Sequence, residues 1–339
     1  MLLAHGDHRR QARAALLTVA NPLLIWAVVA GAHNEALSVM FAVAGLLFMR
    51  KNPFLAGLGI GLAGCAKLSI GLWGLAMLWA YRREPKKAIL LCLGTAVPMA
   101  LAYVLWQPTA FFQVLRNGGY VSVGSWANPI YGFLTLFLSD LDAKIIVGVI
   151  SYIGLIVIAW MLSQTVPWSS VPGLPKGSDL RKDPLTIALR TSLVLSVAWL
   201  ITSMYTLSWY DLMAWVPLAV LATSKLDRIM VLRGAALSLA YVPGRALDVG
   251  AALDFTAHRM RDTISPAVQF IVLLAVVLWW RQPDRPELFP FRRPKPVPEA
   301  EPAATSRPPA KVATQPPKRP PAVTGSRSRS PGLSGSRRR

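Results

Sequence analysis

Long apolar runs recur between Ala14 and Trp280, and charged side chains interrupt them only in short stretches. Hydrophobic residues make up 54% of the 339 residues and charged residues 15%, below the ~25% that is typical of soluble domains. A soluble fold of this size needs far more polar surface to cover its core, so lipid must solvate most of this chain. The run lengths predict an all-α polytopic transmembrane bundle of about ten spans, some of them short.

The formal net charge is +20, but its distribution does not indicate a nucleic-acid-binding protein. About half of the excess lies in residues 292–339, and most other Lys and Arg residues lie in short loops between apolar runs. This is the positive-inside pattern, so the charge reports membrane orientation. We predict a multi-pass protein of the inner (plasma) membrane with both termini in the cytoplasm.

The composition changes after Arg281 to Pro, Arg, Ser and Ala. Such a segment cannot bury enough apolar area to offset the entropy of ordering it. We therefore predict a transmembrane domain over residues 1–281 and a disordered, basic, cytoplasmic tail over residues 282–339. Arg292, Arg293 and Lys295 follow the last span, where each can attract anionic lipid by about 1 kcal/mol.

The positions of the basic loops determine in which direction each span crosses the membrane. Arg50-Lys51 and residues 82–87 mark the cytoplasmic face, so residues 53–81 must cross the membrane an even number of times. Only two short segments fit, which places Lys67 at their turn on the outer face. Four glycines would let these helices pack closely: Gly57, Gly59, Gly61 and Gly64.

The same parity orders the rest of the chain. An outer loop with interfacial helices is expected at 107–142 and a cytoplasmic loop at 167–184. Another outer loop should hold His258, Arg259, Arg261 and Asp262. The remaining predicted spans are residues 14–32, 36–49, 88–106, 145–162, 185–205, 212–222, 231–253 and 264–280.

This topology gathers unusual polar residues on the outer face: His33, Asn34, Glu35, Lys67, Arg116, Asp211, His258, Arg259 and Asp262. Ionisable groups at membrane depth are costly and usually mark a function or a paired structural role. Three polar residues in a row at 33–35 form either a plain turn or a functional site. Lys67 either snorkels to the interface or, as we favour, holds an anion such as a lipid phosphate.

Two further pairs have a structural and a functional interpretation. Trp209-Tyr210 reads first as an interfacial aromatic belt and second as a platform for a sugar ring. Arg245, inside the span 231–253, should pair with Asp248 one turn away.

The sequence contains none of the common metal or cofactor motifs. Cys65 and Cys92 have no metal-ligand spacing, and the Walker A, GxGxxG, HExxH and nucleophile-elbow motifs are missing. Neither a metal nor a cofactor is therefore expected.

Two strings carry a family resemblance. Asn21-Pro22-Leu23-Leu24, followed by Gly31-Ala32-His33-Asn34-Glu35-Ala36-Leu37, resembles a signature of GT-C-type membrane glycosyltransferases. In particular the chain resembles the C-terminal part of polyprenol-phosphate-mannose-dependent α-(1→6)-mannosyltransferases of actinobacterial envelopes. Residues 57–67 and Ser208-Trp209-Tyr210, which leads into Trp215-Val216-Pro217-Leu218, resemble later segments of that family, so the similarity runs from Ala14 to Trp280.

The resemblance implies an active site on the extracytoplasmic face that transfers a hexose, expected to be mannose, from a polyprenyl phosphate to an envelope glycan or glycolipid. Lys67 would hold the donor phosphate, and His33, Asn34 and Glu35 would line the substrate site. Trp209 and Tyr210 would contact sugar. The lipid-linked donor is then a co-substrate, and membrane lipids, the glycan acceptor and envelope glycan-assembly proteins are the expected partners. A cation can stabilise the phosphate leaving group without a metal.

One departure leaves alternatives open. The catalytic aspartate that this family carries in its first outer loop has no counterpart here, so we expect a late-starting reading frame or a truncated relative. The general base is unassigned, with Glu35 as a weak candidate. The alternatives to an enzyme are a non-catalytic paralogue that binds polyprenyl lipid or scaffolds glycan assembly, and a transporter or lipid flippase.

Overall fold

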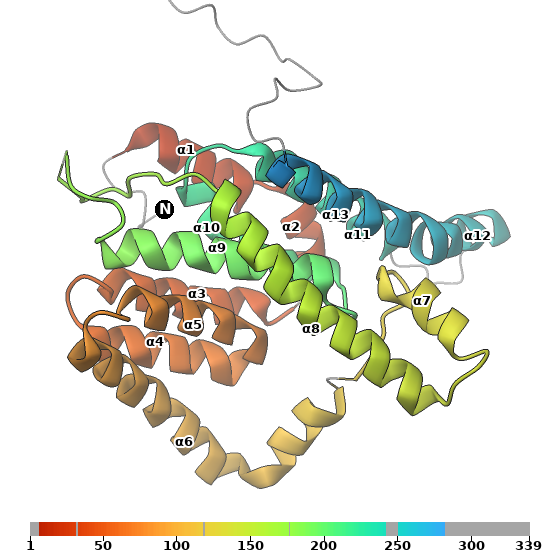
Figure 1. The fold of residues 1–339 in the computed structure, drawn as a ribbon, viewed down its shortest axis with the longest axis horizontal. Coiled ribbons are helices and arrows are strands. Elements are labelled where there is room, and N and C mark those ends of the chain that lie inside the picture. Colours follow the sequence, from red (N-terminus) through yellow and green to blue (C-terminus); the bar gives the residue numbers. More distant parts are fainter. Residues whose placement is uncertain (1–6, 32, 118, 176, 242–249, 282–339) are drawn as a thin grey trace, which may run out of the picture. The chain divides into compact units, whose positions relative to one another are not determined.

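The computed structural model describes residues 7–31, 33–117, 119–175, 177–241 and 250–281, and all regular structure in these ranges is helical (Figure 1). Five helical stretches are long and apolar enough to cross a membrane, and three shorter apolar helices accompany them. The prediction of an all-α membrane bundle is therefore confirmed. The elements are α1 (His8–Leu17), α2 (Pro22–Leu24), η2 (Ile25–Ala30), α3 (Glu35–Phe48), α4 (Pro53–Ala66), η3 (Leu68–Ile70), α5 (Gly71–Ala80), α6 (Pro85–Asn117), α7 (Ala127–Leu134), α8 (Asp140–Thr165), α9 (Pro184–Thr202), η4 (Ser208–Asp211), α10 (Leu212–Val220), α11 (Lys225–Ala240), α12 (Ala251–Arg259), η5 (Met260–Ile264) and α13 (Ser265–Arg281).

The helix α9 forms the centre of the bundle. In its apolar window 83% of the residues are buried, against 17–33% for the other four long stretches, which leaves most of their surface for lipid. It packs against α5, α8 and α10. One polar link reinforces this packing, since the indole of the fully buried Trp73 donates to the Ser196 hydroxyl at 3.0 Å.

The segment 53–81 forms the predicted pair of short helices with Lys67 at the break. Asn52 caps α4 by accepting hydrogen bonds from the backbone N–H groups of Phe54 and Leu55. At Lys67 the backbone turns to the extended region, with φ −157°, and η3 and α5 follow. The Tyr81 hydroxyl donates to the Met49 carbonyl, so the end of α5 returns to the end of α3, just before α4 begins.

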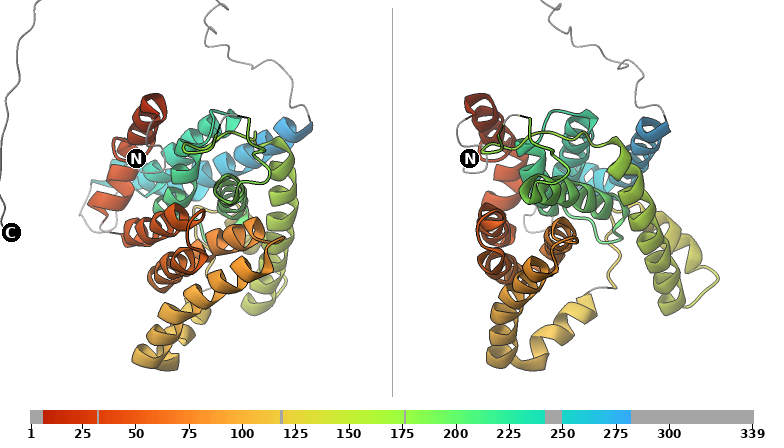
Figure 2. Two further views of the ribbon diagram at one scale, coloured as in Figure 1. Left: turned by 90° about the vertical axis from the view of Figure 1, so that its left-hand side faces the viewer. Right: turned by 60° about the vertical axis from the view of Figure 1, so that its left-hand side comes forward.

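Three of the four predicted glycines lie at close helix contacts, but these contacts are with α6 and α3 and not, as predicted, with α5, the other short helix of the pair. A Cβ on Gly57 would be 2.1 Å from the Leu91 carbonyl oxygen, and one on Gly61 would be 2.5 Å from that of Thr95, so α4 packs tightly along the first half of α6 (Figures 1 and 2). Gly59 faces Gly45 of α3. Gly64 is different, because nothing lies within 4 Å of the position of its Cβ.

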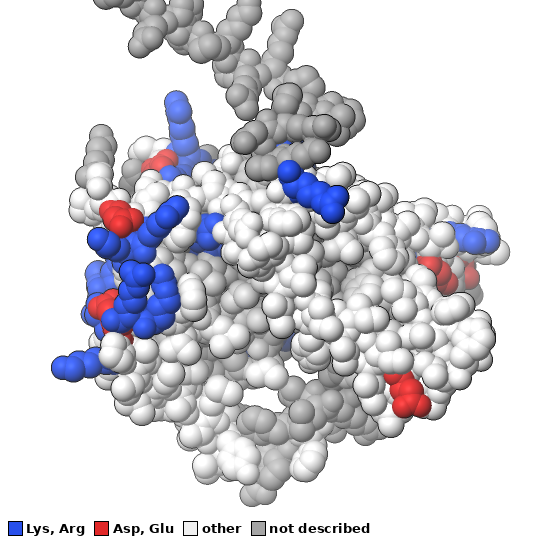
Figure 3. Space-filling view, in the orientation of Figure 1, with Lys and Arg blue, Asp and Glu red and all other residues white. Residues whose placement is uncertain are grey.

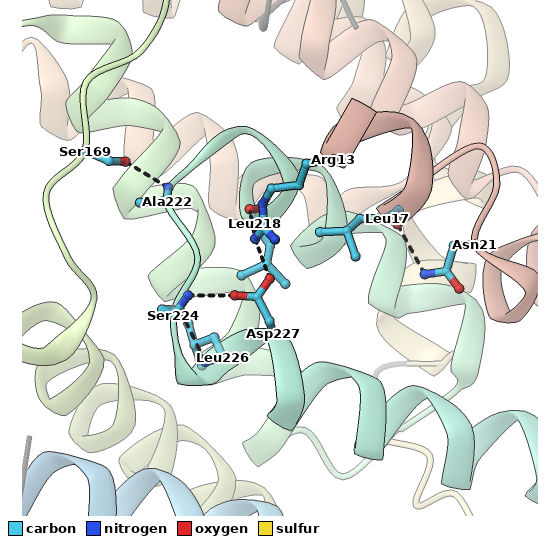
Figure 4. A network of polar contacts seen from close by, with 9 residues as sticks. All are labelled: Arg13, Leu17, Asn21, Ser169, Leu218, Ala222, Ser224, Leu226 and Asp227. Carbon is cyan, nitrogen blue, oxygen red and sulfur yellow. Dashed lines mark hydrogen bonds and ion pairs between the residues drawn. The ribbon is translucent and has the colours of Figure 1, made fainter. Parts of the chain in front are cut away.

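The loops predicted to be cytoplasmic lie together at one end of the helices. The Arg50 guanidinium makes two 2.8 Å hydrogen bonds to the Asp183 carboxylate, which joins the α3–α4 turn to the start of α9. Arg13 of α1 pairs with Asp227 of α11, and Asp227 also accepts from the Ser224 backbone N–H at 2.7 Å (Figure 4). Lys and Arg side chains gather on the left of the view in Figure 3, beside a large surface without charge.

The loops predicted to be extracytoplasmic gather at the other end of the same helices. Lys67 lies there at the end of α4, and Ser122 joins residue 206 through a 2.8 Å hydrogen bond from the Thr206 backbone N–H. The Ser265 hydroxyl, at the start of α13, donates to the Gly124 carbonyl at 2.7 Å. The grouping of the loops agrees with the predicted topology, whereas the assignment of the basic end to the cytoplasm stays a prediction.

Several predicted boundaries are wrong. His258, Arg259, Arg261 and Asp262 do not form a loop, because they lie in the helical stretch α12–η5–α13. This stretch contains neither Gly nor Pro before Pro266, and His258 and Asp254 pair one turn apart at 3.2 Å, which supports a helix despite the charges. The span expected at 231–253 begins earlier, at Lys225, because Ser224 and Asp227 form a capping box.

The start and middle of the chain differ as well. The first candidate span, His8–Val29, begins and ends earlier than predicted, and within it Asn21 caps a new segment at Pro22 by accepting from the Leu23 backbone N–H. The helix α6 extends to Asn117, into the expected outer loop. The Arg245–Asp248 pair and the tail 282–339 lie outside the described residues.

Candidate functional site

A buried ion pair joins two turns at the extracytoplasmic end predicted for the bundle. Lys67 Nζ lies 2.5 Å from Glu35 Oε1, and the Glu35 side chain is only 6% exposed, against 25% for Lys67. The turns are fixed to each other by two further hydrogen bonds. Asn34 Nδ2 donates to the Ala66 carbonyl at 3.2 Å, and the Ser38 hydroxyl donates to the Ala63 carbonyl at 2.9 Å. The break after α4 therefore presents Lys67 to the start of α3.

Tyr210 of η4 completes this arrangement. Lys67 Nζ lies 4.2 Å from the centroid of the Tyr210 ring, within the range of a cation–π interaction. Among the described residues, no partner reaches the second carboxylate oxygen of Glu35, Oε2. The lining of this charged pocket consists of Glu35, Ser38, Val39, Lys67, Ser69, Ile70, Tyr210 and Met213. It contains a cation reachable from outside and a carboxylate oxygen with free lone pairs.

A second pocket, the aromatic pocket, lies beside the charged pocket. The rings of His33 and Trp209 stack at a centroid distance of 3.6 Å and an interplanar angle of 17°. Burial lowers the pKa of His33; Lys67 lowers it further and Glu35 opposes the shift, so the imidazole is neutral at pH 7. The pocket has a volume of about 180 Å³, and its lining consists of Trp26, Ala27, Gly31, His33, Ser208, Trp209 and Tyr241.

A buried charge pair supports η4 from behind. Arg233 of α11 is 0% exposed, and its Nε donates to Asp211 Oδ1 at 3.1 Å, with Asp211 1% exposed. The same guanidinium donates to the side-chain carbonyl of Gln269 in α13. Asp211 directly follows Tyr210, so this pair fixes the segment that carries the Trp209 and Tyr210 rings. The sequence analysis did not identify Arg233. The signal that could have done so is an Arg surrounded by apolar residues within the predicted span 231–253.

The structure brings six of the predicted site residues together: His33, Asn34, Glu35, Lys67, Trp209 and Tyr210. Their roles stay predictions. Asp211 lies behind the site rather than in it. His258 pairs with Asp254, and Asp262 lies 3.4 Å from Arg261. Among the described contacts, neither His258 nor Asp262 touches a residue that lines the two pockets. The side chain of Arg116 is outside the described residues. In the described ranges, no cluster of three His, Cys, Asp or Glu side chains could hold a metal.

These features define a helical membrane protein with a polar site at one end of its bundle. Residues 1–83 match the family model described as alpha-(1→6)-mannopyranosyltransferase, N-terminal domain. The match confirms the resemblance to this family over those residues, and it includes Glu35 and Lys67 but not η4. The matched model is the N-terminal domain of the family, whereas the sequence resemblance predicted the C-terminal part, so that assignment is corrected for residues 1–83. No curated protein and no solved structure matches the chain.

Proposed function

We propose that this chain is a membrane glycosyltransferase that transfers mannose from a polyprenyl-phosphate donor to an envelope glycan or glycolipid on the extracytoplasmic face. The observation that carries the proposal is the Lys67–Glu35 pair, which lies at a helix break inside the matched segment. A cation and a base are the two groups that such a transfer requires once the leaving group is a phosphate.

Lys67 is suited to stabilise the departing phosphate. An ammonium group has three N–H donors, and one of them is taken by Glu35, so two remain for phosphate oxygens. The ring of Tyr210 adds attraction for the cation without occupying a donor. Glu35 beside it is only 6% exposed and Lys67 is 25% exposed, so water screens the Lys67 charge less than at an open surface, and its stabilisation of the breaking bond is correspondingly larger.

Glu35 is suited to accept the proton of the acceptor hydroxyl. Transfer breaks the bond between the anomeric carbon and the phosphate oxygen and forms a bond from that carbon to the acceptor oxygen. The electron pair leaves with the phosphate, and the hydroxyl proton goes to a base. Glu35 Oε2 is buried beside the pocket and has no partner among the described residues, so its lone pairs are available. A phosphate held by Lys67 would be separated from this carboxylate by the ammonium group, whose charge would offset their repulsion.

The test is transfer of radiolabelled mannose from polyprenyl phosphate mannose to an α-(1→6)-linked oligomannoside, in membranes that contain the full chain. Lys67→Met should lower the rate by about a hundred- to a thousandfold, because one charge-stabilising donor is lost. Lys67→Arg should restore part of it, and Glu35→Gln should be as damaging as Lys67→Met. Lys144→Met is the matched control, since Lys144 pairs with Asp140 on the exposed surface of α8.

Near-normal transfer by Lys67→Met, at unchanged membrane abundance, would refute the phosphate role. If the native chain binds polyprenyl phosphate through Lys67 but transfers no hexose, the non-catalytic lipid-binding alternative replaces the enzyme.

A further inference from the structure

The aromatic pocket differs chemically from the charged pocket beside it. Of the described residues that line it, none carries a charge at neutral pH, and four contribute aromatic rings. These four come from separate parts of the chain: Trp26 from η2, His33 from the turn before α3, Trp209 from η4 and Tyr241 from the end of α11. A phosphate would find no counter-charge among these side chains. Flat apolar faces with a few hydroxyl groups suit a neutral ring instead.

Two turns divide their side chains between the two pockets. In the turn 33–35, His33 lines the aromatic pocket and Glu35 the charged pocket. In η4, Trp209 lines the aromatic pocket and Tyr210 the charged one. The rings of Trp209 and Tyr210 are 6.4 Å apart. The charged pocket, at about 10 Å³, holds little more than a water molecule, so a phosphate bound by Lys67 would lie at its opening, next to a ring in the aromatic pocket.

The aromatic surfaces are already in place. Trp209 stacks on His33 on one face and makes an edge contact with Tyr241, with ring centroids 6.0 Å apart. The Tyr241 hydroxyl donates to the Thr206 carbonyl at 3.1 Å, which fixes that ring against the segment before η4. Ser208 adds a buried hydroxyl to the lining. The volume of about 180 Å³ is below the ~300–1,000 Å³ of sites for drug-sized ligands and suits a single ring.

From these observations we infer that the aromatic pocket binds one neutral hexopyranose ring, with the C–H face of the sugar against Trp209 and its hydroxyl groups toward Ser208 and Tyr241. The inference rests on the proposed function and deepens it, because it separates the sugar site from the phosphate site and assigns Tyr210 to the latter. The ring is either the terminal sugar of the acceptor or the mannose of the donor. The binding chemistry is the same in both cases.

The experiment measures binding without turnover, using the purified full chain in detergent and microscale thermophoresis. Three probes are used: linear α-(1→6)-mannotetraose, polyprenyl phosphate mannose and polyprenyl phosphate without sugar. Trp209→Leu should weaken binding of at least one sugar-bearing probe about tenfold, which corresponds to 1.4 kcal/mol. It should leave sugar-free polyprenyl phosphate unchanged. Lys67→Met should give the reverse pattern, with sugar-free polyprenyl phosphate weakened and mannotetraose unchanged.

Two further variants keep the result independent of folding. Ala27→Phe fills the pocket without removing any of its walls, so it should block sugar as Trp209→Leu does. Trp106→Leu is the matched control, because Trp106 is 65% exposed on the surface of α6, and it should change none of the three affinities.

The pattern across the probes identifies the sugar. Loss of mannotetraose binding assigns the pocket to the acceptor, and loss restricted to polyprenyl phosphate mannose assigns it to the donor. The inference is overturned if Trp209→Leu and Ala27→Phe spare both sugar-bearing probes, or if they weaken sugar-free polyprenyl phosphate equally. Failure of the donor site would be seen separately, as sugar-free polyprenyl phosphate binding that does not depend on Lys67.

Discussion

Replacing Arg233 by Met should destabilise this protein more than almost any other single change at a charged residue. Arg233 and Asp211 are 0% and 1% exposed, and Gln269 is the only other described side chain that accepts from the guanidinium. The variant would leave the Asp211 carboxylate buried without its cation. Breaking a buried pair in this way costs about 3–5 kcal/mol. With ~2–4 °C per kcal/mol for large domains, the unfolding temperature should fall by roughly 6–20 °C.

Thermal unfolding in detergent, followed by tryptophan fluorescence, measures this shift. The double variant Arg233→Met with Asp211→Leu should recover most of the loss, because removing both charges of a buried pair is often neutral. Lys144→Met is the control, since its partner Asp140 is exposed, and it should leave the unfolding temperature unchanged. The reasoning is refuted if the single variant unfolds within about 2 °C of the native protein, or if the double variant is no better than the single one.

Three other outcomes are expected. Gly57→Ala should destabilise the protein, because the added Cβ would lie 2.1 Å from the Leu91 carbonyl oxygen. Gly64→Ala, in the same helix, adds its Cβ to open space and should be neutral or stabilising. Unfolding temperatures of the two variants test this difference. Impermeant thiol reagents on intact cells lacking the native cysteines should label Lys67→Cys and spare Arg83→Cys, and labelling of the latter would contradict the predicted topology. The pKa of His33 is lowered in the folded protein, so the unfolded chain takes up a proton first as the pH falls. Stability should therefore decline below pH ~6.5. His33→Gln should flatten that decline, which a series of unfolding temperatures at different pH values measures.

Charge counting and parity predicted the part of the site that depends on topology. The basic loops at both ends of residues 53–81 required a turn at Lys67, and the polar run 33–35 required a turn on the same face. Both turns exist, and the structure shows them in contact through the Lys67–Glu35 pair. The same rule failed at residues 258–262, because it treats every charge as a loop signal. In α12 and η5 the charges lie on a helical stretch that no Gly or Pro interrupts.

The remaining features depend on contacts between distant residues, which hydropathy does not contain. Asp211 and Arg233 belong to different helical segments, and the sequence of neither segment predicts that these two residues form a pair. The aromatic pocket is still less visible in the sequence. Its walls come from four parts of the chain, and two of them, Trp26 and Tyr241, read as ordinary membrane aromatics. Only the arrangement of side chains shows that they surround one space.

The arrangement of the two turns also bears on how the two pockets act together. His33 and Glu35 are two residues apart on one turn, and Trp209 and Tyr210 are adjacent in η4, so neither turn can move without changing both pockets. The Asn34 bond to Ala66 fixes the first turn, and the Asp211–Arg233 pair fixes the second. A sugar bound in the aromatic pocket would contact His33 and Trp209, and any displacement of these residues would pass along the backbone to Glu35 and Tyr210, the two groups in contact with Lys67. Occupancy of the neutral pocket should therefore alter the affinity of the charged one for phosphate, and thermodynamic linkage requires the reverse effect to be equal in size.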